Sequence, residues 1–144
     1  MLFRSRIDIP EDKKLVHESI IPVRWGDMDA LGHVNNAVYF RYIEQARVNW
    51  LDSFGLKVTK GDAGVVVVNA FCNFLKQIAY PADLLVKTYI ANPSRVGVDT
   101  FNVISLTTDP DTIYANGGAT MVWVDFVAQK AAAWPPEIKA KFDL

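Results

Sequence analysis

The sequence predicts an α+β fold in which an antiparallel five-stranded sheet curls around one long central helix. The 144 residues correspond to a single domain covering 1–144. Residues 36–54 have helical periodicity, one strand signal precedes them, and four strand signals separated by short turns follow. Short turns join antiparallel neighbours, and one helix and one sheet can bury their apolar faces only on each other.

Composition and charge argue against several kinds of partner. The net charge of −1 gives no electrostatic reason to expect nucleic acid or an anionic membrane surface. No window approaches the ~20 apolar residues of a membrane span, and the N-terminus does not resemble a signal peptide. The only cysteine, Cys72, excludes an internal disulfide and favours a cytoplasmic location. Because Cys72 lies in an apolar strand signal, we interpret it as a core residue rather than a nucleophile.

The chain before the helix predicts an arm, a strand and a polar loop. Residues 1–15 are interpreted as a peripheral arm. Residues 20–25 have strand character, and Pro22 within them places that strand at a sheet edge or a bulge. Gly26 and Gly32 allow tight turns in the polar stretch that follows.

The long helix is predicted from an apolar arc and from residues suited to each end. Asn35 or Asn36 can cap the N-terminus, and Gly55 suits the position just beyond the C-terminus. The arc is wide enough for a helix that the sheet surrounds. Its members are Tyr39, Phe40, Tyr42, Ile43, Ala46, Trp50, Leu51 and Phe54.

The chain after the helix predicts four strands and a short helix. Residues 57–62 are interpreted as a connector, and Gly117-Gly118 as the mark of a β-bulge. Pro135-Pro136 precedes a helix at 137–142, where proline is tolerated in the first turn. The strands are expected at residues 64–75, 84–91, 96–107 and 112–129.

Asp29 is the first candidate for chemistry. A carboxylate beside a helix N-terminus can act as a nucleophile or as a general base toward water. Asp27 is the rival carboxylate, and capping a turn would explain an aspartate in this loop equally well. His33 could orient Asp29 or a water molecule, or contact a ligand, although a single histidine is more often structural.

The start of the helix offers hydrogen-bond donors. The backbone N–H groups near Asn36 and Ala37 have no partner within the helix, so they can polarise an acyl carbonyl and hold an oxyanion. The side chains of Asn35 and Asn36 could donate to the same carbonyl, although capping also explains them. No serine nucleophile elbow, phosphate-binding glycine loop, zinc-spaced cluster or dinucleotide fingerprint occurs. No metal or redox cofactor is therefore expected.

The segment from Trp25 to Arg47, with Gly-Asp-Met-Asp-Ala-Leu-Gly-His-Val-Asn-Asn at its start, resembles hotdog-fold acyl-CoA thioesterases of the 4-hydroxybenzoyl-CoA thioesterase-like family. The resemblance implies the hotdog fold, a homodimer or homotetramer with sites between subunits, Asp29 as the catalytic carboxylate and an oxyanion donor near Asn36. It also implies contacts with coenzyme A from Arg95 and Gly97. The loop further resembles plant acyl-carrier-protein thioesterases, which carry a catalytic asparagine where this chain has Leu31.

The function expected from these observations is hydrolysis of an acyl-CoA thioester to a carboxylic acid and coenzyme A. Asp29, His33 and Asn36 would form the catalytic group, with Asn35 and Ala37 among the substrate contacts. A non-catalytic acyl-CoA-binding or regulatory protein of the same fold is the alternative. A hotdog dehydratase is disfavoured because its typical His-Phe-Pro segment is absent.

Overall fold

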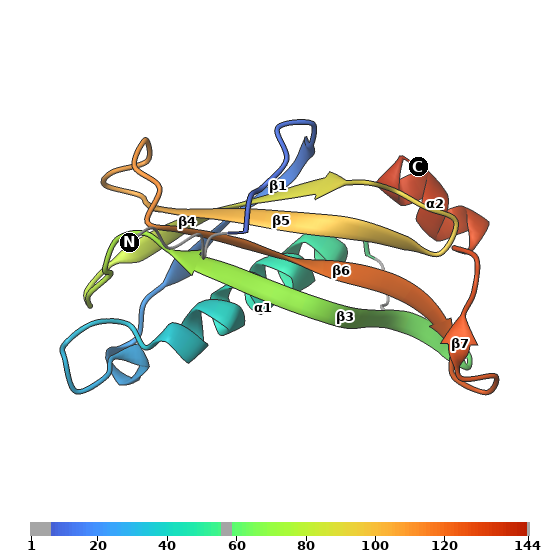
Figure 1. The fold of residues 1–144 in the computed structure, drawn as a ribbon, viewed down its shortest axis with the longest axis horizontal. Helices are drawn as coiled ribbons and strands as arrows, with labels where there is room; N and C mark the ends of the chain where they lie inside the picture. The colour runs from blue at the N-terminus through green and yellow to red at the C-terminus, as the bar shows by residue number, and fades with distance from the viewer. Residues whose placement is uncertain (1–6, 56–58, 144) are drawn as a thin grey trace, which may run out of the picture.

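The computed structural model describes residues 7–55 and 59–143. The predicted arm and connector therefore lie partly outside the described residues, at 1–6 and 57–58. The described chain forms one antiparallel sheet with the long helix α1 (Asn36–Ser53) against one of its faces (Figure 1). A second helix, α2 (Pro136–Phe142), lies at one end of the sheet.

The sheet contains the five predicted strands and two additional strands of two residues each. Its order is β1-β4-β5-β6-β3-β2, with β7 paired to β6, and every pairing is antiparallel. The predicted fold class is confirmed. The long strands are β1 (Lys14–Pro22), β3 (Ala63–Phe74), β4 (Asp83–Ala91), β5 (Gly97–Leu106) and β6 (Ala115–Asp125), and the short ones are β2 (Thr59–Lys60) and β7 (Lys130–Ala131).

Helix α1 forms at the predicted residues and with the predicted ends. The side chain of Asn35 accepts a hydrogen bond from the Ala37 N–H at 3.1 Å, which makes Asn35 the N-cap. Gly55 has a φ of +66° just beyond the helix, where a side chain would be strained. Phe40, placed on the predicted apolar arc, is 40% exposed. The buried face consists of Tyr39, Tyr42, Ile43, Ala46, Trp50 and Leu51.

Two groups of apolar side chains make up the core between α1 and the sheet. One surrounds the N-terminal half of α1 and includes Tyr39, Tyr42 and Val34. The other surrounds Trp50, onto which Phe142 of α2 stacks with ring centroids 5.0 Å apart. Burial of these large side chains holds α1 in place, so the loop that precedes α1 is attached to a rigid support.

The first strand begins and ends earlier than predicted. β1 covers Lys14–Pro22, and the chain then forms a short 3-10 helix, η1 (Trp25–Asp27), in which Trp25 is 78% exposed. The polar start of β1 carries little periodicity, and pairing with β4 is what defines it. Within residues 7–55 and 59–143, β1 pairs with β4 alone, so the prediction of an edge strand from Pro22 is confirmed.

The prediction of a β-bulge at Gly117-Gly118 is wrong. Both glycines pair in regular register with β3 and β5, and the irregularity lies in β3 between Val67 and Asn69. A Cβ atom on Gly117 would collide with the carbonyl oxygen of Phe71, and one on Gly118 with that of Thr100. The glycines therefore permit close strand packing. The strand expected to reach residue 129 ends at Asp125 and turns back into β7.

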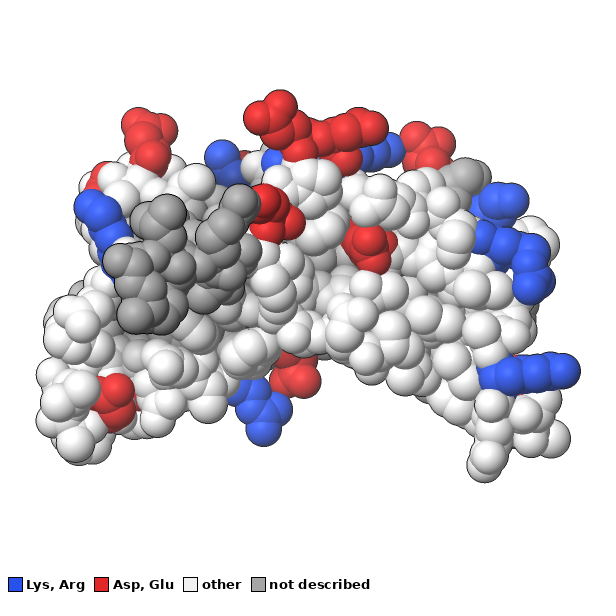
Figure 2. All heavy atoms as spheres, in the orientation of Figure 1, with Lys and Arg blue, Asp and Glu red and all other residues white. Residues whose placement is uncertain are grey.

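The edge of β3 is largely open. β2 pairs with β3 only through Ala63 and Gly64, so β3 has no described neighbour on that side from Val65 to Phe74. Neither described helix has the length and apolar character that crossing a membrane requires. In Figure 2, the face of the sheet turned away from α1 is mostly uncharged, and a group of basic side chains lies at the end that carries α2.

Candidate catalytic site

The loop between η1 and α1 is held closed by its own backbone. Met28 and Val34 form a β-bridge. Inside it, the Asp29 N–H donates to the His33 carbonyl at 2.8 Å and the Gly32 N–H to the Asp29 carbonyl at 3.1 Å. Gly32 has a φ of +80°, a conformation that glycine adopts without strain. The loop thus presents Asp29 and His33 beside the helix N-terminus.

The Asp29 carboxylate is half-buried and uses one of its two oxygens within the loop. Oδ1 accepts the Leu31 N–H at 2.9 Å and, at the longer distance of 3.5 Å, the His33 N–H. Among the residues that the structure describes, Oδ2 accepts no hydrogen bond. One oxygen therefore fixes the orientation of the carboxylate and the other is available to a reactant.

The first turn of α1 leaves one backbone donor available next to Asp29. The Ala37 N–H is already bonded to Asn35, and the Val38 N–H donates to the Asn35 carbonyl at 2.9 Å. The Asn36 N–H makes no hydrogen bond within the described part of the chain. Because it also lies at the positive end of the helix dipole, it suits a developing oxyanion.

Asp29, His33 and Asn36 line the same pocket, with a volume of about 360 Å³. Its floor is aromatic, since the rings of Tyr39 and Phe74 meet edge to face at 5.0 Å. Burial raises the pKa of Tyr39, so this phenol stays protonated. The remaining lining residues are Leu31, Val34, Leu75, Lys76 and Gln77.

Residues far from the loop in the chain complete this pocket, and the loop sequence does not predict them. Phe74 ends β3 and Lys76 follows it, about forty residues beyond the loop, and tertiary packing alone brings them there. Tyr39 could have been recognised, because it follows Asn36 by three positions and so shares its side of the helix. Asn35 and Ala37 are exposed at the helix start and do not line the pocket.

Arg95 and Gly97 lie away from Asp29 within one chain. They belong to the turn that leads into β5, at the end of the sheet near α2, whereas the Asp29 loop lies at the opposite end (Figure 1). The Gly97 N–H donates to Ser94 Oγ at 3.0 Å, and the Gly97 carbonyl accepts from the Trp134 indole at 3.4 Å. One copy of the chain therefore does not bring the two predicted groups of residues together.

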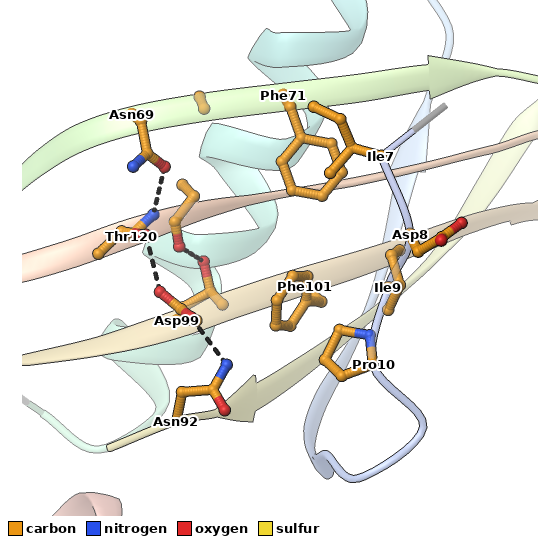
Figure 3. Close-up of a pocket in the computed structure, with 13 residues that line it drawn as sticks. Ile7, Asp8, Ile9, Pro10, Asn69, Phe71, Asn92, Asp99, Phe101 and Thr120 are labelled. Atoms are coloured by element: carbon orange, nitrogen blue, oxygen red, sulfur yellow. Dashed lines mark hydrogen bonds between the residues drawn. The ribbon is translucent and has the colours of Figure 1, made fainter. Parts of the chain in front are cut away.

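A larger pocket, of about 580 Å³, lies on the opposite face of the sheet (Figure 3). Phe71 and Phe101 form its apolar part beneath the arm, and Asp99 lies at its polar end. Both carboxylate oxygens of Asp99 are occupied, by Thr120 Oγ1 at 2.7 Å and by Asn92 Nδ2 at 2.9 Å. This pocket presents no activated nucleophile, so the smaller pocket is the better candidate for chemistry.

Two further features bear on the chemistry. Burial raises the pKa of the Cys72 thiol to about 12, so the thiolate that a cysteine nucleophile requires is disfavoured. This agrees with the interpretation of Cys72 as a packing residue. Across the described residues, no three histidine, cysteine or acidic side chains converge to form a metal site.

Comparison with known proteins identifies the family to which this chain belongs. Residues 23–142 match the family described as the Thioesterase-like superfamily. Long-chain acyl-CoA thioesterase FadM of Escherichia coli is 29% identical over 126 residues, covering 85% of this chain and 94% of FadM. The chloroplastic acyl-acyl carrier protein thioesterase ATL2 of Arabidopsis thaliana is 30% identical over 114 residues, covering 76% of this chain and 59% of ATL2.

A solved structure with a sequence identity similar to that of FadM and ATL2 also supports the fold. The PA2801 protein of Pseudomonas aeruginosa, described as a putative thioesterase, superposes with a TM-score of 0.83 and 34% sequence identity. The match covers 90% of this chain and 99% of that protein. The hotdog architecture and the family resemblance predicted from the loop are confirmed.

Proposed function

This chain belongs to the Thioesterase-like superfamily, and we propose that it hydrolyses an acyl-CoA thioester to a free carboxylic acid and coenzyme A. One observation carries the proposal. Asn36 and the half-buried Asp29 line the same pocket, and neither Asp29 Oδ2 nor the Asn36 N–H makes a hydrogen bond with a described residue. Thioester hydrolysis needs these two functions, a nucleophile or base and an oxyanion donor.

The reaction can proceed by either of two routes from this arrangement. In the first, Asp29 attacks the thioester carbonyl and expels the coenzyme A thiolate, and water then hydrolyses the resulting anhydride. In the second, Asp29 takes a proton from water as it attacks the carbonyl, and the tetrahedral intermediate then breaks its C–S bond and expels the coenzyme A thiolate. In both, the Asn36 N–H stabilises the oxyanion, and His33 on the pocket wall orients the water or the substrate.

A second copy of the chain completes the proposed substrate site. Arg95 and Gly97 lie at the far end of their own subunit from Asp29, which favours contacts with the coenzyme A portion from another subunit. The open edge of β3 is a surface on which two copies can pair. We therefore propose a homodimer or homotetramer with shared sites.

Release of free thiol from a panel of acyl-CoA substrates tests the proposal directly. The panel should include short, long and aromatic acyl groups, and matched acyl-carrier-protein thioesters should be run beside it. Hydrolysis of coenzyme A thioesters supports the proposal. Tight binding of acyl-CoA without thiol release by the intact oligomer would establish the non-catalytic alternative instead.

A further inference from the structure

Asp27 connects three separate parts of the chain around the candidate site. Its Oδ2 accepts the Arg24 N–H at 2.9 Å and the Tyr42 hydroxyl at 2.7 Å. Its carbonyl accepts the Asn35 N–H at 3.0 Å. The N-cap of η1, the N-cap of α1 and the body of α1 therefore all meet at Asp27.

Tyr42 provides the rigid side of this connection. Tyr42 is 4% exposed as a residue and belongs to the core around the N-terminal half of α1. Burial, and then the hydrogen bond to Asp27, raise the pKa of Tyr42, so the hydroxyl remains a donor throughout the working pH range. The Asp27 carboxylate is thus held by a group that can neither move freely nor lose its proton.

The two proposed reacting groups lie close to this connection in the chain. Asp29 is two residues after Asp27, and Asn36 directly follows Asn35, whose N–H is bonded to Asp27. A shift of the loop relative to the helix would change the spacing between the Asp29 carboxylate and the Asn36 N–H. Misplacement of a reacting group by 1 Å can cost about 10²-fold in rate.

We propose that Tyr42 and Asp27 are positioning residues, whose hydrogen bond sets the distance between the Asp29 carboxylate and the oxyanion donor at the start of α1. The inference rests on the proposed function, because it assigns these residues through their effect on Asp29 and Asn36. It gives Asp27, the rival carboxylate in the sequence, a distinct role. Asp27 holds the loop and does not react.

The test compares Tyr42→Phe, Asp27→Ala, the double variant and Asp27→Asn in the full-length protein. Tyr42→Phe keeps the buried ring, and we expect kcat to fall about tenfold with KM nearly unchanged, since geometry rather than binding is altered. The double variant should lose no more than about twofold beyond the worse single variant, because each change breaks the same Tyr42–Asp27 hydrogen bond and Asp27→Ala differs only in also removing the acceptor of the Arg24 N–H. Asp27→Asn should retain most activity, because a single amide oxygen can accept both bonds that now reach Oδ2.

Tyr114→Phe is the matched control. The Tyr114 hydroxyl donates to Asp109 Oδ2 at 3.0 Å, so this variant also removes a tyrosine–aspartate hydrogen bond, but outside the loop. Its kcat should stay within about twofold of wild type even if its melting temperature falls. Independent, additive losses from Tyr42→Phe and Asp27→Ala would overturn the inference, as would a Tyr42→Phe variant no slower than the control.

Hydrogen exchange of the Asn35 amide provides a readout that does not depend on activity. This N–H donates to Asp27, so Tyr42→Phe should raise its exchange rate about tenfold as the loop loosens, and Tyr114→Phe should leave it unchanged. If the wild-type protein releases no thiol from any substrate, the proposed function fails while the exchange experiment still decides whether Tyr42 holds the loop. Equal Asn35 exchange in both variants would refute the positioning role.

Discussion

Replacement of Asp29 by asparagine separates chemistry from structure at the candidate site. An asparagine oxygen can keep the acceptor position that Oδ1 now fills for the Leu31 N–H at 2.9 Å. The change removes the negative charge and puts an NH₂ group in place of Oδ2, which accepts no hydrogen bond from the described residues. The loop should keep its shape while the proposed nucleophile or base is lost.

The size of each effect follows from these contacts. Loss of a general base lowers kcat by at least ~10²-fold. That factor corresponds to about 2.7 kcal/mol of transition-state stabilisation. The stability cost is smaller, because removing a negative charge near a helix N-terminus costs about 0.3–1 kcal/mol. The melting temperature should therefore fall by no more than about 4 °C.

The assay measures thiol release under saturating acyl-CoA, with acyl-CoA binding and melting temperature followed in parallel. Asp27→Asn is the control, and it should lose much less activity. Near-wild-type turnover by Asp29→Asn, with an inactive Asp27→Asn, would refute the assignment within the pair. Full activity in both variants would place the chemistry elsewhere. A single turnover in ¹⁸O-water then separates the two routes: label in the Asp29 carboxylate indicates an anhydride, and label only in the product acid indicates direct attack by water.

Three further predictions concern His33, the assembly and Cys72. We expect His33→Ala to lower kcat about tenfold at nearly unchanged melting temperature, and a lower melting temperature with full activity per folded molecule would make His33 structural. Light scattering in dilute solution should give at least twice the 16.1 kDa of one chain, and a monomer would exclude a shared site. Because folding raises the pKa of Cys72 from 9.0 to about 12, its contribution to stability is complete below pH 9 and is lost as the pH rises toward 12. Alkylation of Cys72 at pH 9 should therefore be slow in the folded protein and fast after unfolding, and equal rates would contradict the burial of the thiol.

The sequence was most informative where local chemistry determines structure. The ends of α1 were predictable because an asparagine cap and a glycine with positive φ satisfy requirements of the helix itself. The strands after residue 63 were predictable from β-branched runs bounded by turn residues. The first strand was predicted too far along the chain. Its polar start has no local strand signal, and pairing with β4 alone defines it.

At the candidate site, too, local sequence indicated some residues, and only tertiary packing brought in the others. A short polar stretch ending in a helix cap was enough to indicate Asp29, His33 and Asn36, because each lies within one loop and one helical turn. The loop motif favoured Asp29 over Asp27, and the tertiary structure gives a physical reason: Asp29 lines the pocket that holds Asn36, whereas Asp27 lies outside it and its Oδ2 accepts from Arg24 and Tyr42, the latter fifteen residues further along the chain. The tertiary structure alone placed Phe74 beside the loop and Arg95 at the opposite end of the molecule. Local sequence determines caps, turns and periodicity, but which distant residues meet depends on how the sheet pairs and how the apolar side chains pack against α1.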